Sequence, residues 1–437
     1  MRTRLHPSTG PLRGAVRVPG DKSICHRALL LGAIAQGDTH VRGFSQGADN
    51  LATIDALRRM GVQLEVDGAA VTIHGTQLRA PGTPLDCRNS GTTMRLLAGL
   101  LSGLGVAAVL TGDHSLSKRP MERVAGPLRA QGLDVQTSHG TAPVHIRAGG
   151  TFRGDQVDLK MASAQVKSAM LLAALGRGVS LRVTEPHPSR DHTEHMLRAM
   201  GVGIVSSAHY TNPDGHDGRA QVLLPAHGVP LAPLDIQLPG DISSAAFLMA
   251  AAAIVPGSIV DLPQVGVGAT RTGVLEALST ARVPVQISQR VTVHGEAIAD
   301  IQVRAGAAQG MDVPPSMVPR LVDEIPVLAV VAACLPGISS FCGVGELRVK
   351  ESDRLERTAA LLRACGRHIE IRGDNLFVHG QAAPLRHFSF DAEDDHRMAA
   401  AAAVASLAAD GPCAIDGIDV LGVSYPNLLQ DLESLKQ

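Results

Sequence analysis

The chain has 437 residues, more than one hydrophobic core usually serves, so two domains are expected. Its formal net charge of -1 gives no general attraction to nucleic acid or to anionic membranes, and seven Phe, two Tyr and no Trp leave few rings on which bases could stack. Six scattered cysteines without C-x-x-C spacing, a start without the apolar core of a signal peptide, and apolar runs too short to span a bilayer predict a cytoplasmic protein with reduced thiols.

Internal repeats organise the sequence. Six times, a short polar or glycine-bearing stretch runs into an almost wholly apolar helix, and successive starts are about 70–80 residues apart. The stretches begin at Gly20, Asn89, Ser163, Gly240, Asp323 and Asp394. Helices that are apolar on every face must be buried on every side. Their Ala and Gly content is expected to let neighbouring helices and strands approach closely.

A second, amphipathic helix follows each apolar one, and five of these run into a short β-rich stretch. The glycine after the helix fits a C-cap in four of the five, whereas the fourth unit has Ala281-Arg282 there. Each interval therefore predicts strand, buried helix, strand, surface helix and a strand pair, which is an α/β fold.

Six such units divide into two groups of three, each with three buried helices at its centre. A Pro-rich stretch at 230–241 separates the third unit from the fourth. A solenoid is the alternative architecture, but each unit carries only one all-apolar helix and the count stops at six.

Cations and hydroxyl groups gather at the helix starts, although the macrodipole normally favours acids there. Helix N-termini bind anions, so lysines and arginines at several of them indicate an intended anionic ligand. Single residues have simpler explanations, because Ser23, Ser163 and Ser189 fit N-caps and His396 fits a hydrogen-bonded structural histidine. Those explanations do not account for the recurrence. If the buried helices run parallel, their starts open on one face of each domain, and two such faces meet across a cleft.

Other chemistries fit poorly. Gly14 lies one residue too far upstream and Asp21 interrupts the spacing of a Walker A loop before Lys22. His192 and His195 lie three apart without a zinc-binding motif, so neither a metal nor a cofactor is expected.

Seven motifs in order resemble those of the enolpyruvyl transferase family, over essentially the full length: "PGDKSICHR", "NSGTTMR", "LSKRPM", "MASAQVKSA", "LVDEIPVL", "VKESDR" and "DDHRM". The resemblance is to the second class of the members that use shikimate 3-phosphate. It implies two inside-out α/β domains, each of three βαβαββ units around buried parallel helices. Residues 1–19 and 238–437 would form one domain and 20–237 the other, with the active site in the cleft between them. It also implies a monomer.

The implied reaction transfers the carboxyvinyl group of phosphoenolpyruvate to the 5-hydroxyl of shikimate 3-phosphate and releases phosphate. In it Asp323 is the base on the hydroxyl, Glu351 is the acid/base at the methylene carbon, and Lys22 protonates the leaving phosphate or the bridging oxygen. The residues implied for shikimate 3-phosphate are Lys22, Ser23, Arg27, Ser163, Ala164, Gln165, Ser189, Arg190, Asp323 and Lys350. Those implied for phosphoenolpyruvate are Lys22, Gly91, Arg119, Gln165, Arg354, His396 and Arg397.

Several departures and two alternatives accompany this prediction. Val423 stands where many family members have a lysine, and Ser90 and Leu96 differ from the glyphosate-sensitive pattern. Gly91 leaves room where some glyphosate-tolerant members have alanine, so we expect glyphosate still to compete with phosphoenolpyruvate. One alternative is the sister enzyme that acts on UDP-N-acetylglucosamine, but the loop "DHSLSKRPM" lacks the reactive cysteine expected of it. The other is a non-catalytic anion-binding relative, which would be expected to have lost Asp323 or Glu351.

Overall fold

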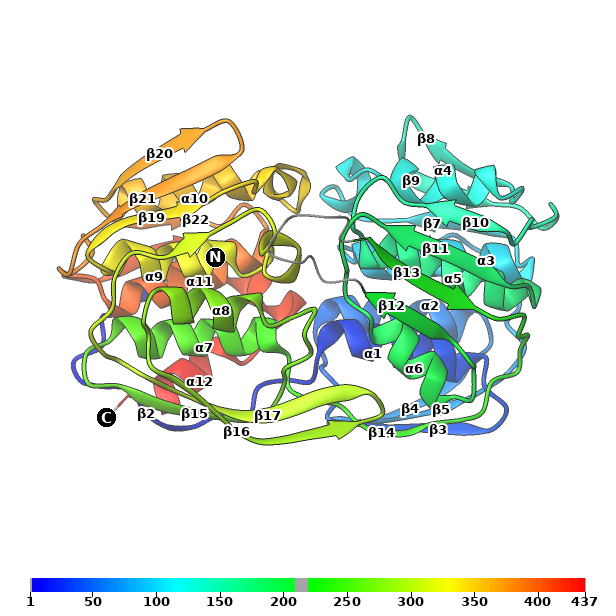
Figure 1. The fold of residues 1–437 in the computed structure, drawn as a ribbon, viewed down its shortest axis with the longest axis horizontal. Coiled ribbons are helices and arrows are strands. Elements are labelled where there is room, and N and C mark those ends of the chain that lie inside the picture. The colour runs from blue at the N-terminus through cyan, green and yellow to red at the C-terminus, as the bar shows by residue number, and fades with distance from the viewer. Residues whose placement is uncertain (1, 209–218, 437) are drawn as a thin grey trace. The chain divides into compact units, whose positions relative to one another are not determined.

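The computed structural model describes residues 2–208 and 219–436. The chain divides into two compact units (Figure 1). Unit 1 contains Met1–Pro19, Pro239–Val293 and Ala297–Gln437, and unit 2 contains Gly20–Leu238 and His294–Glu296. Each unit has its own hydrophobic core, because one cluster of buried apolar side chains lies wholly in unit 1 and another wholly in unit 2.

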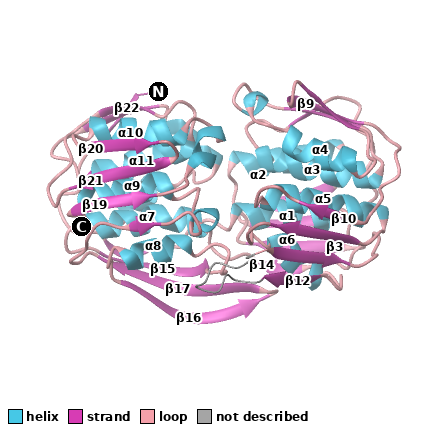
Figure 2. Cartoon of the chain, turned by 45° about the horizontal axis from the view of Figure 1, so that its top comes forward, coloured by secondary structure: helices cyan, strands magenta, loops and turns pink. Residues whose placement is uncertain are grey.

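Three buried helices form the centre of each unit, as the repeats predict (Figure 2). They are α1 (Lys22–Ala33), α3 (Gly91–Leu104) and α5 (Ala164–Arg177) in unit 2, and α7 (Ile242–Ile254), α9 (Ile325–Cys334) and α11 (His396–Leu407) in unit 1. Almost every residue of these helices is buried, which is what apolar side chains on all faces require. None of the helices among the described residues is long and apolar enough to cross a membrane.

A second helix follows each buried one, and these six are partly exposed. They are α2 (Ala48–Arg59), α4 (Glu122–Ala130), α6 (His192–Ala199), α8 (Gly273–Thr280), α10 (Arg354–Ala364) and α12 (Leu428–Ser434). Gly61, Gly132, Gly201 and Gly366 follow four of them with positive φ, as the C-cap pattern predicts. After α8 the same left-handed conformation is adopted by Arg282, at φ 59°. The turn is therefore kept even where the glycine is missing.

Each unit carries three sheets, and the sheets of unit 2 share one order. A leading strand runs parallel to the next strand, and a hairpin follows antiparallel to that strand. The first sheet, β14-β3-β5-β4, contains β14 (Asp235–Gln237), β3 (Asp38–Arg42), β5 (Ala70–His74) and β4 (Gln63–Asp67). The second, β6-β7-β9-β8, contains β6 (Leu85–Asp86), β7 (Ala108–Thr111), β9 (Thr141–Ile146) and β8 (Val135–Ser138). The third, β10-β11-β13-β12, contains β10 (Gln156–Asp158), β11 (Leu181–Glu185), β13 (Ala220–Leu224) and β12 (Val205–Ala208).

The sheets of unit 1 follow the same plan, except that one of them has three strands instead of four. They are β16-β17-β15-β2, with β16 (Val285–Val293), β17 (Glu296–Arg304), β15 (Ile259–Gly266) and β2 (Arg13–Ala15); β18-β19-β21-β20, with β18 (Asp312–Val313), β19 (Gly337–Phe341), β21 (Asn375–Gly380) and β20 (His368–Arg372); and β1-β23-β22, with β1 (Arg2–Leu5), β23 (Cys413–Asp416) and β22 (Ser389–Asp391). Short 3₁₀ turns η1 (Leu116–Lys118), η2 (Val318–Arg320), η3 (Gly345–Val349) and η4 (Ile418–Val423) join some elements.

Two leading strands come from distant parts of the chain. The early strand β2 pairs parallel with β15 in unit 1, and β14, near residue 236, pairs parallel with β3 in unit 2. The chain therefore passes from unit 1 to unit 2 after Pro19 and back after Leu238.

Helices α3 and α5 pack backbone against backbone. A Cβ added to Gly99 would lie 2.2 Å from the carbonyl oxygen of Ala169, and one added to Gly103 would lie 2.5 Å from that of Ala173. Because both contacts advance by four residues in the same direction, the two helices run parallel. Their N-terminal ends therefore lie at the same end of unit 2.

The first prediction concerns this contact. Gly99→Ala should lower the free energy of unfolding by about 1–3 kcal/mol, because the methyl group collides with backbone that cannot move away, and the gain in helix propensity of about 1 kcal/mol does not offset the collision. Urea denaturation measures the change. Gly82→Ala is the matched control, since a Cβ there has nothing within 4 Å. Equal stability of the two variants would contradict the tight contact.

Candidate active site

In unit 2, the first group of predicted residues lies at the start of α1. The N-cap is Asp21, whose Oδ1 accepts from the backbone N of Ile24 at 3.0 Å, so Ser23 is not the cap. Lys22 is the first helical residue, and its Nζ lies 2.9 Å from Oδ2 of Asp49 in the first turn of α2. Lys22 and Ser23 are both partly exposed. The ammonium group is thus held in place beside accessible surface.

Arg27 ties the start of α1 to two other helices. Its Nε donates to Thr193 Oγ1 at 2.6 Å, Nη1 to the carbonyl of Ser23 at 2.8 Å and Nη2 to Ser168 Oγ at 2.8 Å. Burial lowers the pKa of Arg27 to about 10, so the side chain is still a cation at neutral pH. The result is a buried positive charge fixed between α1, α5 and α6.

Ser163 and Ser189 meet on one carboxylate. Oε1 of Glu185, the last residue of β11, accepts from the backbone N of Ser163 at 3.2 Å and from Ser189 Oγ at 2.6 Å. Ser163 also caps α5, whereas the N-cap of α6 is Asp191. The N-cap explanation therefore holds for Ser163 but not for Ser189. Both serines are predicted ligands of shikimate 3-phosphate, and Glu185 fixes them next to each other.

Glu185 is itself part of a buried charge cluster. The Nζ of Lys167 lies 2.9 Å from Glu185 Oε2 and 2.8 Å from Glu194 Oε1, and all three side chains are at most 2% exposed. Burial alone lowers the pKa of Lys167, but Glu194 and Glu185 raise it above its usual value. The cluster joins α5, β11 and α6 behind the two serines.

A pair of guanidinium groups lies over the start of α3. A Cβ on Gly91 would lie 2.7 Å from Arg95 Nη1 and 3.4 Å from Arg119 Nη1. Arg119 Nη2 donates to Asn89 Oδ1 at 2.5 Å, and Arg95 Nη1 donates to Gln165 Oε1 at 2.7 Å. Gly91 and Gln165 therefore contact Arg95, which was not assigned to a substrate, and Arg119 lies beside Gly91.

The remaining predicted residues of unit 2 lie at the same helix starts. Ala164 is the first residue of α5, Arg190 lies two residues before α6, and both are partly exposed. The unit 2 group is thus defined as Lys22, Ser23, Arg27, Gly91, Arg119, Ser163, Ala164, Gln165, Ser189 and Arg190.

In unit 1, Asp323 lies just before α9 among three cations. Its Oδ1 is 3.4 Å from Arg354 Nη1 and 3.9 Å from Lys350 Nζ, and its Oδ2 is 4.0 Å from Arg397 Nη2. The N-cap position of α9 belongs to Glu324, so Asp323 is not an ordinary capping residue. Its side chain is 18% exposed, which leaves the carboxylate accessible.

Arg354, the first residue of α10, joins three carboxylates. Its Nε and Nη2 lie 2.9 and 3.1 Å from the two oxygens of Asp395, and Nη2 lies 2.6 Å from Glu351 Oε2. Burial alone lowers the pKa of Arg354, but Asp395 and Glu351 raise it above its usual value. The predicted catalytic pair, Asp323 and Glu351, is therefore anchored on one guanidinium that keeps its charge.

The start of α11 completes this arrangement. Arg397 Nη1 donates to the carbonyl of Asp323 at 3.1 Å and lies 3.5 Å from Glu324 Oε1, which also accepts from Ser243 Oγ on α7. His396 is the first residue of α11 and is buried. The starts of α7, α9 and α11 are thus linked. The unit 1 group is defined as Asp323, Lys350, Glu351, Arg354, His396 and Arg397.

The sequence did not identify the carboxylates that hold the predicted residues in place. Glu185, Glu194 and Asp395 hold predicted residues through buried contacts, and none of them was assigned a role. One signal was available: a lysine inside the apolar helix "SAQVKSAMLL" cannot be buried without carboxylates nearby.

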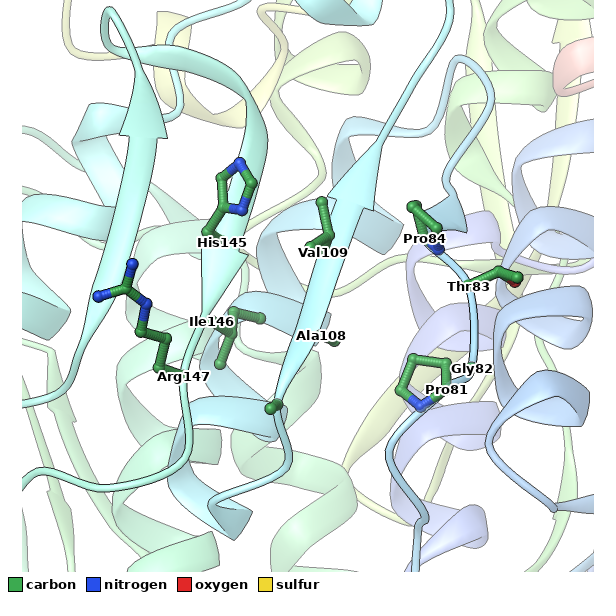
Figure 3. Close-up of a pocket in the computed structure, with 10 residues that line it drawn as sticks. Pro81, Gly82, Thr83, Pro84, Ala108, Val109, His145, Ile146 and Arg147 are labelled. Atoms are coloured by element: carbon green, nitrogen blue, oxygen red, sulfur yellow. The ribbon is translucent and has the colours of Figure 1, made fainter.

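Unit 2 also has a surface hollow (Figure 3). It is lined by residues 81–84, 107–109 and 145–147, which include His145 and Arg147. These residues precede β6, begin β7 and end β9, whereas Gly91 and Arg119 follow the carboxyl ends of β6 and β7. No predicted site residue lines the hollow, so we do not assign it to the candidate site.

The second prediction tests the buried cluster. Lys167→Met should lower the free energy of unfolding by about 3–5 kcal/mol, because Glu185 and Glu194 would remain buried and unpaired. Chemical denaturation at pH 7 measures the loss. Arg42→Met removes a pair with Asp235 at 2.7 Å, but there both side chains are more than half exposed, so its cost should be about 0–1 kcal/mol. Equal losses in the two variants would contradict this account of the cluster.

Comparison with known proteins identifies the family. The sequence model of EPSP synthase (3-phosphoshikimate 1-carboxyvinyltransferase) matches residues 7–432. The 3-phosphoshikimate 1-carboxyvinyltransferases of Halorhodospira halophila and Acidithiobacillus ferrooxidans are 44% and 46% identical to this chain, and the matches cover 98% and 95% of it and 94% of each relative.

Solved structures agree. EPSP synthase from Acinetobacter baumannii has 41% sequence identity and a TM-score of 0.84, with 100% of this chain and 98% of that chain covered. The enolpyruvyl transferase NikO from Streptomyces tendae, at 19% identity, shares the fold with a TM-score of 0.74 over 99% of this chain and 96% of that one. The resemblance read from the seven motifs is thereby confirmed, and the chain belongs to the EPSP synthase (3-phosphoshikimate 1-carboxyvinyltransferase) family.

Proposed function

We propose that the protein transfers the enolpyruvyl group of phosphoenolpyruvate to the 5-hydroxyl of shikimate 3-phosphate, as the step of aromatic amino-acid biosynthesis that its family name describes. The observation that carries the site assignment is the pair of carboxylates on Arg354. Asp323 and Glu351 come from different elements and lie 3.4 and 2.6 Å from its guanidinium nitrogens. Two accessible carboxylates fixed close together can exchange protons with two different atoms of one substrate pair.

The reaction needs both carboxylates. In the addition step, Asp323 takes the proton of the 5-hydroxyl, and the hydroxyl oxygen bonds to C2 of phosphoenolpyruvate. At the same time Glu351 delivers a proton to the methylene carbon. In the elimination step, Glu351 takes a proton back from that carbon, the double bond re-forms and the C–O bond to phosphate breaks. Lys22 protonates the departing phosphate. One proton is lost by the acceptor hydroxyl and one is gained by phosphate, and the cycle closes when Asp323 releases its proton to water and Lys22 takes one from water.

Fixed cations stabilise the charges that develop during these steps. Shikimate 3-phosphate is proposed to bind Lys22, Ser23, Arg27, Ser163, Ala164, Gln165, Ser189, Arg190, Asp323 and Lys350. Ser163 and Ser189 are the best supported of these, because Glu185 already holds them as a pair. Phosphoenolpyruvate is proposed to bind Lys22, Gly91, Arg119, Gln165, Arg354, His396 and Arg397. Here the support is that Arg119 lies beside Gly91, and that Arg354 and Arg397 both lie within 4.0 Å of the partly exposed carboxylate of Asp323.

The acceptor follows from the family. The curated relatives are 3-phosphoshikimate enzymes, so the alternative acceptor, UDP-N-acetylglucosamine, is not retained. A non-catalytic anion-binding relative is disfavoured by the presence of both Asp323 and Glu351. The proposal includes a monomeric enzyme that acts in the cytoplasm, as the family resemblance implies.

The third prediction is acceptor-dependent phosphate release. Incubated with phosphoenolpyruvate, the protein should release phosphate only when shikimate 3-phosphate is present, because the C–O bond to phosphate breaks only after the acceptor has added. A coupled phosphate assay measures the rate. UDP-N-acetylglucosamine is the control acceptor and should give no release. Release without any acceptor, or none with shikimate 3-phosphate, would overturn the proposal.

The same assay separates the roles of the carboxylates. Asp323→Asn and Glu351→Gln should each lower kcat by roughly 10²- to 10⁴-fold, the usual contribution of a positioned acid or base. Glu356→Gln, which changes an exposed carboxylate on α10 paired with Arg348, should leave kcat unchanged. Near-normal turnover in either catalytic variant would show that its role is wrongly assigned.

The fourth prediction concerns the room beside Gly91. Gly91→Ala places a methyl group against the guanidiniums of Arg95 and Arg119, so the anion held there loses contact. The KM for phosphoenolpyruvate should rise by roughly 5- to 30-fold, equivalent to about 1–2 kcal/mol. Glyphosate, which we propose competes at this place, should inhibit the wild type competitively and the variant less strongly.

Inhibition series at varied phosphoenolpyruvate measure both effects, and Gly82→Ala is again the control because its Cβ meets nothing. Non-competitive inhibition of the wild type, or an unchanged KM in Gly91→Ala, would contradict this use of Gly91.

A further inference from the structure

The hairpin of β20 and β21 presents three metal-ligating side chains on one face. His368 and His379 are cross-strand partners in register, and Glu370 lies two residues beyond His368 on β20. Ile369 and Val378 point into the core, so the alternating side chains of these strands point outward. The two imidazoles and the carboxylate therefore share the outer face of the hairpin, at the edge of the sheet (Figure 1).

The donor atoms already have the spacing of a metal site. Glu370 Oε1 lies 3.3 Å from His368 Nε2 and 2.9 Å from His379 Nε2, and one ligand atom from each residue lies within 4.8 Å of the others. Ligands about 2.1 Å from a zinc ion in tetrahedral geometry are about 3.4 Å apart. Only small side-chain rotations separate this arrangement from a coordinated one. The imidazole rings, tilted 60° with centroids 4.5 Å apart, are not stacked flat against each other.

A further residue prepares the carboxylate. Arg372 donates to the other oxygen, Glu370 Oε2, from Nε at 3.0 Å and Nη2 at 2.5 Å, and its guanidinium lies over the ring of Phe377. This contact orients the carboxylate, as outer-shell partners of metal ligands do. Hydrogen bonds from Arg372 and the two histidines lower the pKa of Glu370 to about 2, so the ligand is ionised at neutral pH. The positive charge of Arg372 also opposes a cation, which limits affinity.

We propose that His368, Glu370 and His379 bind one divalent transition-metal ion of the class that prefers imidazole and carboxylate ligands, such as Zn²⁺ or Cu²⁺. The exposed side chain of His368 leaves the remaining coordination positions to water. The bound ion joins the edge strand β20 to β21. None of the three residues belongs to the unit 1 or unit 2 group, so this site is independent of enolpyruvyl transfer.

The fifth prediction is therefore metal binding that depends on both histidines. Calorimetric titration of the EDTA-treated protein with Zn²⁺ at pH 7.5 should show one ion per chain. His368→Ala and His379→Ala should each weaken the affinity at least about tenfold, because each removes a ligand. His387→Ala is the matched control: this histidine pairs with Asp410, at 3.0 Å, and its loss should leave the affinity of the saturable site unchanged.

Spectroscopy and pH give independent readouts. Electron paramagnetic resonance of bound Cu²⁺ should show coupling to two nitrogens in the wild type and to one in either alanine variant. Binding should weaken as the pH is lowered, because protons compete with the metal ion for its ligands. The acceptor-dependent activity of the metal-free variants should match the wild type, which checks that they are folded. The absence of saturable Zn²⁺ binding, or equal affinities of His379→Ala and His387→Ala, would overturn the proposal.

Discussion

The burial of helices that are apolar on every side is the constraint on which this structure depends. Such helices cannot lie on a surface, so each unit surrounds three of them with sheets and partly exposed helices. Close parallel packing, seen where Gly99 and Gly103 meet Ala169 and Ala173, puts the helix starts at one end. Apart from Arg177, the lysines and arginines of these helices lie within the first two turns.

The positive charges of lysines and arginines at helix starts are balanced by carboxylates of the protein. Asp49 faces Lys22, Asp395 holds Arg354, and Glu185 with Glu194 encloses Lys167. Such pairs keep each cation in one position before an anion arrives, which reduces the ordering cost of binding. They also overcome the helix dipole, which would otherwise oppose a cation at the first helical residue. The cations at the helix starts are therefore held in place by carboxylates of the protein itself.

The sequence predicted the features that repeat along the chain, whereas contacts between residues distant in the sequence were seen only in the structure. The six apolar helices and the cations at their starts follow from periodicity and from the motifs. Glu185 could not be assigned, because its relation to Ser163 and Ser189 arises only when β11 lies beside the start of α5. His368 and His379 likewise come together through strand register, and a search for sequential zinc spacing cannot detect them. That residues 1–19 belong with the C-terminal half was implied by the resemblance alone.

The pairing of β1 and β2 with strands that follow unit 2 in the sequence limits the order in which the protein can fold during translation. Unit 2, apart from His294–Glu296, is continuous from Gly20 to Leu238, and its sheet β14-β3-β5-β4 is complete once β14 has been synthesised. Strands β1 and β2 precede unit 2 in the sequence, yet their partners β23 and β15 follow Leu238. The two sheets of unit 1 that contain β1 and β2 can therefore close only after the continuous part of unit 2 has been synthesised.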